Sequence, residues 1–172
     1  EFIRNKVAPE IDAFRFAAYA GLENISKVSS GASFSTGEAV IAALRAATTK
    51  MDEDEVPVEN RLLYITPTNK GLIDDLDTTK SKEVMKKFSK IIEEPQRRFY
   101  TAITLKDGKT EGETAGGYTK AADAKDINFM IIHKPAIIKY DKHTASDIIP
   151  SSSNPDADAD ISKYRKYGIV DV

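Results

Sequence analysis

The stretch from Ser35 to Leu76 constrains the fold most, because it is marked as helix, strand and helix in succession. Ser35 can cap a helix, and Glu38 follows three residues later, which is the spacing of a capping box. Apolar residues then recur at helical spacing, at Val40, Ile41, Leu44, Ala47 and Met51. Such a stripe must pack on another surface, so the pattern predicts that a second layer of secondary structure covers this face of the helix.

The segment that follows supplies that surface. Arg61–Ile65 (Arg-Leu-Leu-Tyr-Ile) has the length and the β-favouring composition of a buried strand. Thr66 can cap a second helix, with Pro67 at the first helical position, where its missing N–H costs nothing. Three apolar residues of that helix are expected to face inward: Leu72, Ile73 and Leu76.

A helix is also predicted at the start of the chain. Its apolar stripe consists of Ile3, Val7, Ile11, Phe14 and Ala18. Pro9 lies inside the stripe, so we expect either a kink or a fresh helix start there. Phe16 and Tyr19 lie off the stripe, and Gly21 ends the helix.

The rest of the chain is mostly β in pattern. The periodicity predicts a helix over Lys82–Lys87, followed by extended chain over Phe88–Glu93. Strands are predicted at Phe99–Leu105 and Ile127–His133, with a flexible loop or hairpin tip between them over Lys106–Asp126. Further extended chain is predicted at Ala136–Tyr140, Ile148–Pro150 and Ile161–Val172, with an acidic loop over Ser151–Asp160. This order of elements favours an α+β fold over a regular doubly wound sheet.

Composition excludes several functional classes. The 172 residues include 25 basic and 27 acidic ones, so no overall charge attracts nucleic acid or anionic lipid. There is no cysteine, which excludes disulfides, a thiol nucleophile and thiolate-bound metal. No apolar run approaches the length of a membrane span. The chain has no initiator methionine and opens inside an apolar pattern, so we expect a fragment or a processed product.

One short motif could bind a metal. Asp156, Asp158 and Asp160 have the spacing that opens a calcium-binding loop. Ile161 then occupies the position that needs glycine, and Tyr167 the position that needs a bidentate glutamate. The motif therefore favours a solvated acidic loop, and the three aspartates remain weak candidates.

The other polar residues predict structural roles. His133 and His143 lack the spacing of a zinc site, and Glu93 and Glu94 are expected on the solvated surface. The pair Arg97–Arg98 precedes two aromatic residues and could touch a phosphate, but without a wider basic field it favours ion pairs within the chain or between subunits. We expect neither an enzyme nor a bound cofactor.

Taken in order, several segments resemble the major capsid protein of tailed bacteriophages, with the Hong Kong 97-type fold that encapsulins share. The segments are Glu1–Phe16, which looks like that family's spine helix, Arg61–Pro67, Glu94–Tyr100, Ile127–Lys134, and Asn154–Ala159 with Tyr164–Tyr167. The resemblance implies that residues 1–29 are the spine helix and its exit loop, 30–135 the axial domain, and 136–172 strands of the peripheral domain.

The resemblance also implies a function. The chain would be a structural protein that assembles into an icosahedral shell around phage or prophage double-stranded DNA. It would be made in the bacterial cytoplasm and would end in the virion. Its partners would be copies of itself in hexamers and pentamers, scaffold and portal proteins, and DNA indirectly, with no membrane. Candidate assembly residues are Arg4, Arg15, Arg97 and Arg98.

Three alternatives remain open. An encapsulin-type compartment would share the fold, and a calcium-dependent binding module would use the loop Asp156–Asp160. The segment Val84–Ile92 has helical periodicity, whereas the resemblance implies a strand.

The arm and extended loop that precede the spine helix in the family are not in this sequence, so we expect this chain alone to be a monomer or small oligomer.

Overall fold

The computed structural model describes residues 1–76, 78–113, 115–155 and 157–171, with the backbone alone at 139, 141–143 and 171. The chain divides into two units, Glu1–Ala136 and Ile137–Val172. Both helices and strands are present, in parallel and antiparallel pairs, so the α+β class expected from the sequence is confirmed.

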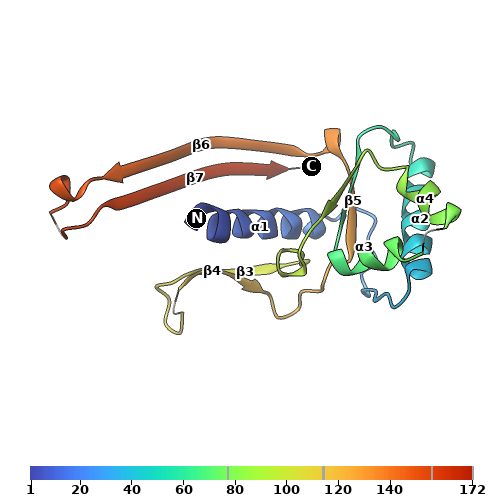
Figure 1. Ribbon diagram of the computed structural model, residues 1–172, viewed down its shortest axis with the longest axis horizontal. Coiled ribbons are helices and arrows are strands. Elements are labelled where there is room, and N and C mark those ends of the chain that lie inside the picture. The colour runs from blue at the N-terminus through green and yellow to red at the C-terminus, as the bar shows by residue number, and fades with distance from the viewer. Residues whose placement is uncertain (77, 114, 156, 172) are drawn as a thin grey trace. The chain divides into compact units, whose positions relative to one another are not determined.

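The first unit holds the helices and two small sheets (Figure 1). Its helices are a π-helical turn η1 (Ile3–Val7), α1 (Ala8–Gly21), α2 (Gly37–Glu53), α3 (Pro67–Asp74) and α4 (Thr79–Met85), with short 3₁₀ turns η2 (Gln96–Arg98) and η3 (Lys134–Ala136). Its strands are β1 (Arg61–Ile65), β2 (Lys90–Glu93), β3 (Ile103–Asp107), β4 (Gly116–Lys120) and β5 (Phe129–His133).

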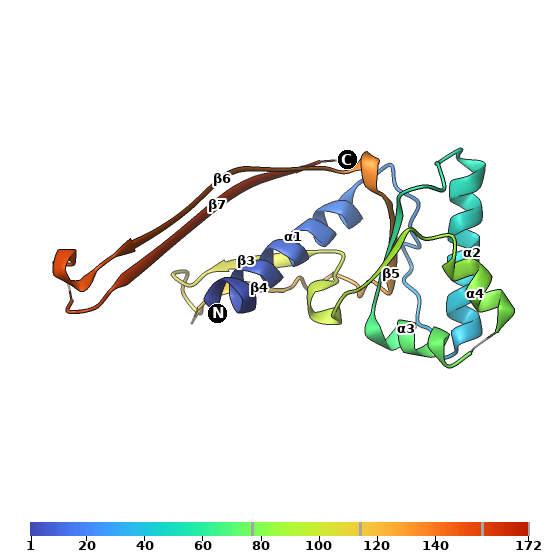
Figure 2. The same cartoon turned by 45° about the horizontal axis from the view of Figure 1, so that its top comes forward.

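The central sheet has the order β2-β1-β5, with β1 parallel to β2 and antiparallel to β5. Successive side chains of a strand point to opposite faces, and β1 uses both faces. Leu63 and Ile65 are fully buried in the cluster formed with the helices α2, α3 and α4, whereas Tyr64 packs on the side of α1. Figure 2 shows α1 on one side of this sheet and α2 and α4 on the other.

The helix, strand and helix predicted from the sequence are present and form the main core. Strand β1 and helix α3 begin where they were expected, and the Thr66 hydroxyl accepts the N–H of Asn69 as a cap. The buried members of this core are Val40, Ile41, Leu44, Leu63, Ile65, Ile73, Val84 and Phe88. Leu72 and Leu76 are partly buried against it, as predicted.

The predicted cap of α2 was wrong by one residue. Thr36, not Ser35, is the N-cap, and its hydroxyl accepts the N–H of Ala39. Glu38 is therefore the second residue of the helix instead of the third, and the capping box expected with it cannot form.

The segment Val84–Ile92, for which helix and strand were both predicted, contains the end of a helix and most of a strand. Helix α4 contains Val84 and ends at Met85, and strand β2 contains Ile91 and Ile92. The helix starts before Lys82 because Thr78 and Ser81 cap its first turn reciprocally, each side chain accepting the other's backbone N–H.

A buried arginine holds the turn between α2 and β1. Arg61 is fully buried, and its guanidinium donates to the carbonyl of Pro57 at 3.0 Å and pairs with a carboxylate oxygen of Asp52 at 2.6 Å. Lys87 approaches the other oxygen of Asp52 at 3.0 Å. Hydrogen bonds from Lys87 and then Arg61 lower the pKa of Asp52 below its ordinary value.

The first helix buries a different face from the one predicted. Its buried residues are Pro9, Ala13 and Phe16, whereas Ile3 and Phe14 of the predicted stripe are 47% and 48% exposed. The α-helix starts at Ala8, next to Pro9, as the proline predicted.

Aromatic packing decides which face of α1 is buried. The Phe16 ring meets Tyr64 and Phe99 edge-on, with ring centroids 5.2 and 4.8 Å apart. These partners come from β1 and from the residue after η2, so the helix stripe alone could not indicate them.

The glycine-rich segment is a hairpin. Strands β3 and β4 pair in antiparallel register from Ile103↔Lys120 to Asp107↔Gly116. The strand predicted at Phe99–Leu105 begins later, because the 3₁₀ turn η2 precedes it and Phe99 is fully buried in the aromatic cluster. In the connecting turn Asp107 accepts the N–H groups of Lys109 and Thr110, which lowers its pKa to about 2.

The second unit is one long hairpin. Strand β6 (Ile138–Ile149) pairs in antiparallel register with β7 (Ile161–Asp171), with a register shift between Asp141 and His143. The two short extended segments predicted in 136–150 are therefore parts of one strand, because the residues between them also pair with the long partner β7 on both sides of the register shift. The loop between the strands contains the turn η4 (Ser151–Ser153).

Candidate functional site

Exposed apolar side chains on the first helix form one candidate surface. Phe2, Ile3 and Phe14 are each about half exposed or more. Ile3 and Phe14 belong to the amphipathic stripe read from the sequence, which such a helix normally buries against a partner. Within the first unit, η1 and α1 thus carry exposed apolar side chains away from the buried aromatic contact of Phe16.

One face of the long hairpin is a second candidate surface. Tyr140 pairs directly with Ile169, so their side chains lie on the same face, and Ile138 and Tyr167 share it because they are two residues away along each strand. All four side chains are more than half exposed. Two strands alone make a marginally stable structure in water, so this apolar face favours binding to another surface.

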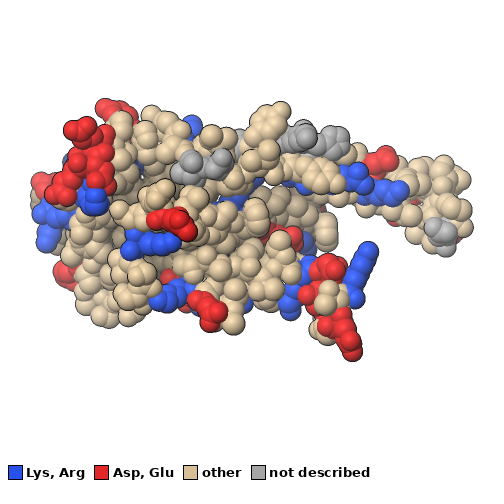
Figure 3. All heavy atoms as spheres, turned by 180° about the vertical axis from the view of Figure 1, so that it is seen from behind, with Lys and Arg blue, Asp and Glu red and all other residues tan. Residues whose placement is uncertain are grey.

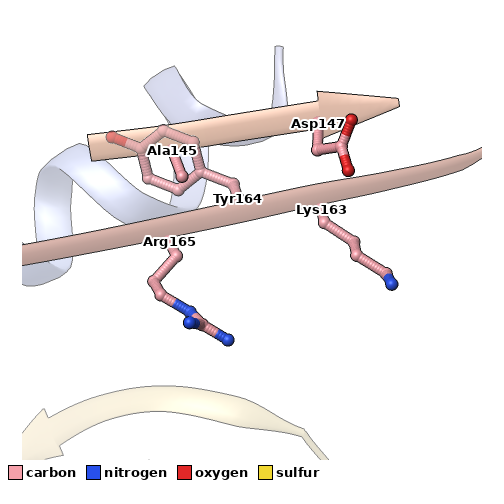
Figure 4. A pocket seen from close by; sticks show the side chains of 5 residues that line it. All are labelled: Ala145, Asp147, Lys163, Tyr164 and Arg165. Carbon is pink, nitrogen blue, oxygen red and sulfur yellow. The ribbon is translucent and has the colours of Figure 1, made fainter. Parts of the chain in front are cut away.

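The middle of the hairpin is charged. A shallow groove is lined by Ala145, Asp147, Lys163, Tyr164 and Arg165. Figure 4 shows the side chains of Lys163 and Arg165 leaving β7 on one side and Tyr164 on the other. Asp147 pairs across the strands with Lys163, which places opposite charges side by side on one face.

A cluster of charged side chains lies within the first unit, between α1, the end of β2 and η2. Arg98 Nη1 lies 3.3 Å from Asp12 Oδ2 and 3.8 Å from Glu94 Oε1. Arg15 Nη1 approaches the other oxygen of Asp12 at 4.0 Å. Two arginines and two carboxylates therefore share one site, which we call the Asp12 cluster.

Burial changes the protonation chemistry of this cluster. The Glu94 side chain is only 10% exposed, and its Oε1 has no hydrogen bond among the described residues. Burial, together with the charge of Asp12, raises the pKa of Glu94, and Arg98 opposes this rise. Burial also raises the pKa of Tyr64 on the neighbouring strand, and the charge of Glu94 adds to the rise. The cluster ties the first helix to the sheet by charge as well as by aromatic packing.

The predicted assembly arginines have different surroundings. Arg15 and Arg98 meet at Asp12, so Arg98 is an ion-pair partner within the chain. Arg4 is exposed in η1, and Arg97 is exposed in η2, where its carbonyl accepts the hydroxyl of Tyr118. Whether any of the four contacts a neighbouring subunit stays a prediction.

Two of the three aspartates of the acidic loop are among the described residues. Asp156 lies outside the described residues, Asp158 is exposed, and Asp160 is exposed and accepts the backbone N–H of Ser151 at 2.8 Å. In the described part of the chain, no three histidine or acidic side chains come together as a metal site would require. Nor does any helix there combine the length and the apolar character needed to cross a bilayer.

Charges of both signs are mixed over the face of the molecule shown in Figure 3. Lysine and arginine side chains alternate there with aspartate and glutamate, and no broad basic field covers that face.

Sequence reasoning missed the two carboxylates of the Asp12 cluster. Glu94 was expected on the solvated surface with Glu93, but only Glu93 is exposed. The sequence pattern that could have indicated these ion pairs is their spacing. Glu94 and Arg98 are four residues apart, and Asp12 and Arg15 are three residues apart. That spacing allows ion pairs, but burial depends on the sheet beneath them.

Comparisons with known proteins place the chain in no family. No model of a protein family matches it, and neither curated proteins nor solved structures include a significant match.

Proposed function

We propose that this chain is a structural shell protein of the Hong Kong 97-type fold, a major capsid protein that assembles with copies of itself around phage or prophage double-stranded DNA. The basis is the ordered resemblance described above, from the first helix to the acidic loop. The exposed apolar side chains on η1 and α1 and on one face of the hairpin support it. Apolar patches on a protein surface often mark sites of association.

The hairpin face is the structural observation that supports the resemblance most directly. Ile138, Tyr140, Tyr167 and Ile169 lie together on a two-stranded ribbon. A ribbon of this length also has two outer edges whose backbone groups can pair with another chain. Shell subunits need such surfaces, because each contact must offset the loss of translational and rotational freedom on assembly.

The test uses the natural gene product that carries this sequence, expressed in bacterial cells. Electron microscopy and sedimentation should find closed shells. Replacing Tyr167 and Ile169 together with lysine should leave dispersed, folded subunits, because charge would replace the apolar face. Ser146→Lys is the matched control, since Ser146 is exposed on the opposite face of the same hairpin.

The outcomes separate the candidate functions. Normal shells from the double lysine variant, or no particles from the parent, would contradict the proposal as stated. Shells that enclose a protein cargo and no DNA would favour the encapsulin-type role. Calorimetry with calcium addresses the remaining alternative: stoichiometric heat that Asp158→Ala abolishes would favour a calcium-dependent module.

A further inference from the structure

The Asp12 cluster places two carboxylates against one guanidinium nitrogen. Arg98 Nη1 is 3.3 Å from Asp12 on α1 and 3.8 Å from Glu94 at the end of β2. The main chain of Glu94 is fixed to β1, because its backbone N–H donates to the carbonyl of Ile65 at 2.9 Å. The two acids therefore compete for Arg98, and of the two Glu94 is the buried one, at 10% exposed against 35% for Asp12.

We propose that Asp12, Glu94 and Arg98 form a proton-operated latch that holds the first helix more firmly on the sheet when Glu94 is protonated. A neutral Glu94 can stay in its buried position without the cost of burying a charge. Arg98 is then left to Asp12 alone, and their ion pair joins α1 to η2. This inference concerns the fold of the first unit and does not depend on the proposed function.

The arginines and tyrosines around the cluster keep one protonation state near pH 7, so the change of charge is assigned to Glu94. Arg15 and Tyr19 lie on α1, Tyr64 on β1, Arg97 on η2 and Tyr118 on β4. Arginines stay charged throughout the range of interest. Burial raises the pKa of each of these tyrosines above its ordinary value of 10.0, so they stay neutral near pH 7.

The sign of the pH dependence follows from the raised pKa of Glu94. Its ordinary value is 4.5, and in the folded protein burial lifts the pKa above that value. The folded state therefore holds the proton more tightly than the unfolded state does. The stabilisation is complete below pH 4.5 and is lost as the pH rises through the folded pKa.

The first experiment compares the parent chain with Glu94→Gln, which mimics the protonated side chain. Urea unfolding is measured at several pH values between 4.5 and 8. Glu94→Gln should be the more stable protein at pH 8, and its advantage should shrink towards pH 4.5. Glu93→Gln is the matched control, because Glu93 is exposed, and should show no pH-dependent difference.

The second experiment reads the latch directly. Carbon-13 NMR of the parent should show the Glu94 carboxyl titrating above pH 4.5. Amide hydrogen exchange, corrected for intrinsic rates, should show that the amides of α1 become more protected relative to those of α2 when the pH is lowered. Asp12→Asn should shift the Glu94 titration to lower pH and abolish the change in α1. A Glu94 carboxyl that titrates at its ordinary pKa, or equal α1 protection at pH 5 and pH 8, would overturn the proposal.

Discussion

Gly37 provides a sharp test of the packing between α2 and α3. It is the first residue of α2 and is buried. A Cβ added there would lie 2.1 Å from the backbone oxygen of Leu72 and 2.8 Å from the Cγ of Leu76. The nearest atom belongs to the backbone of α3, so a side-chain rotation cannot relieve the clash. The substitution Gly37→Ala therefore requires the two helices to move apart.

The magnitude follows from two opposing effects. Overpacking a close-packed site costs about 1–3 kcal/mol, and a clash with backbone belongs near the upper end. Alanine returns up to about 1 kcal/mol of helix propensity relative to glycine, and less at the first helical position. We expect Gly37→Ala to lower the free energy of unfolding by about 2 kcal/mol.

A second glycine serves as the matched control. Gly71 lies within α3, and nothing lies within 4 Å of a Cβ added there. Gly71→Ala should raise the free energy of unfolding by about 0.5–1 kcal/mol, because the helix gains propensity without a clash. Urea unfolding followed by circular dichroism at a helical wavelength measures both, since all α-helices of the described chain lie in the first unit. If Gly37→Ala were as stable as the parent, the close approach of α2 to α3 would be wrong.

Three further outcomes can be measured in the same way or by NMR. Leu44→Ala should cost about 2–5 kcal/mol, because that side chain is fully buried, whereas the exposed Thr49→Ala on the same helix should change stability by no more than about 0.5 kcal/mol. Asp52→Asn should be less stable than the parent at pH 7, and the difference should vanish at low pH: a lowered folded pKa gives stability that is present above the ordinary value of 3.8 and lost as the pH falls through the folded pKa. The Asp107 carboxyl should titrate at about 2 in carbon-13 NMR, and a value near 3.8 would mean that its turn is not formed in solution.

The elements whose signals are local were predictable from the sequence. The strand Arg61–Ile65 and the cap at Thr66 have the predicted bounds, because side chains within a few residues specify them. Val40 and Leu44 are buried as their helical spacing indicated. Strand β5 ends at His133, as predicted, two residues before Pro135, since proline cannot donate to a strand ladder.

Boundaries that depend on distant partners were not predictable. The sequence predicted two short extended pieces in the strand of residues 138–149, and pairing with β7 on both sides of the register shift joins them. Burial of Phe16 instead of Phe14 depends on the rings of Tyr64 and Phe99, which come from other parts of the chain. Periodicity reports that a helix has an apolar face, but not which face meets the sheet.

The candidate site shows the same division. The sequence by itself indicated that the pair Arg97–Arg98 forms ion pairs, without naming their partners, and it places glycine at 37 and 71. Only the tertiary structure decided that Glu94 is buried while Glu93 is exposed, that Asp12 shares Arg98 with Glu94, and that a methyl group has room at one glycine and not at the other. The physical reason is that capping and spacing act along a few residues of chain, whereas desolvation, ion pairing and steric fit depend on which segments the fold brings together.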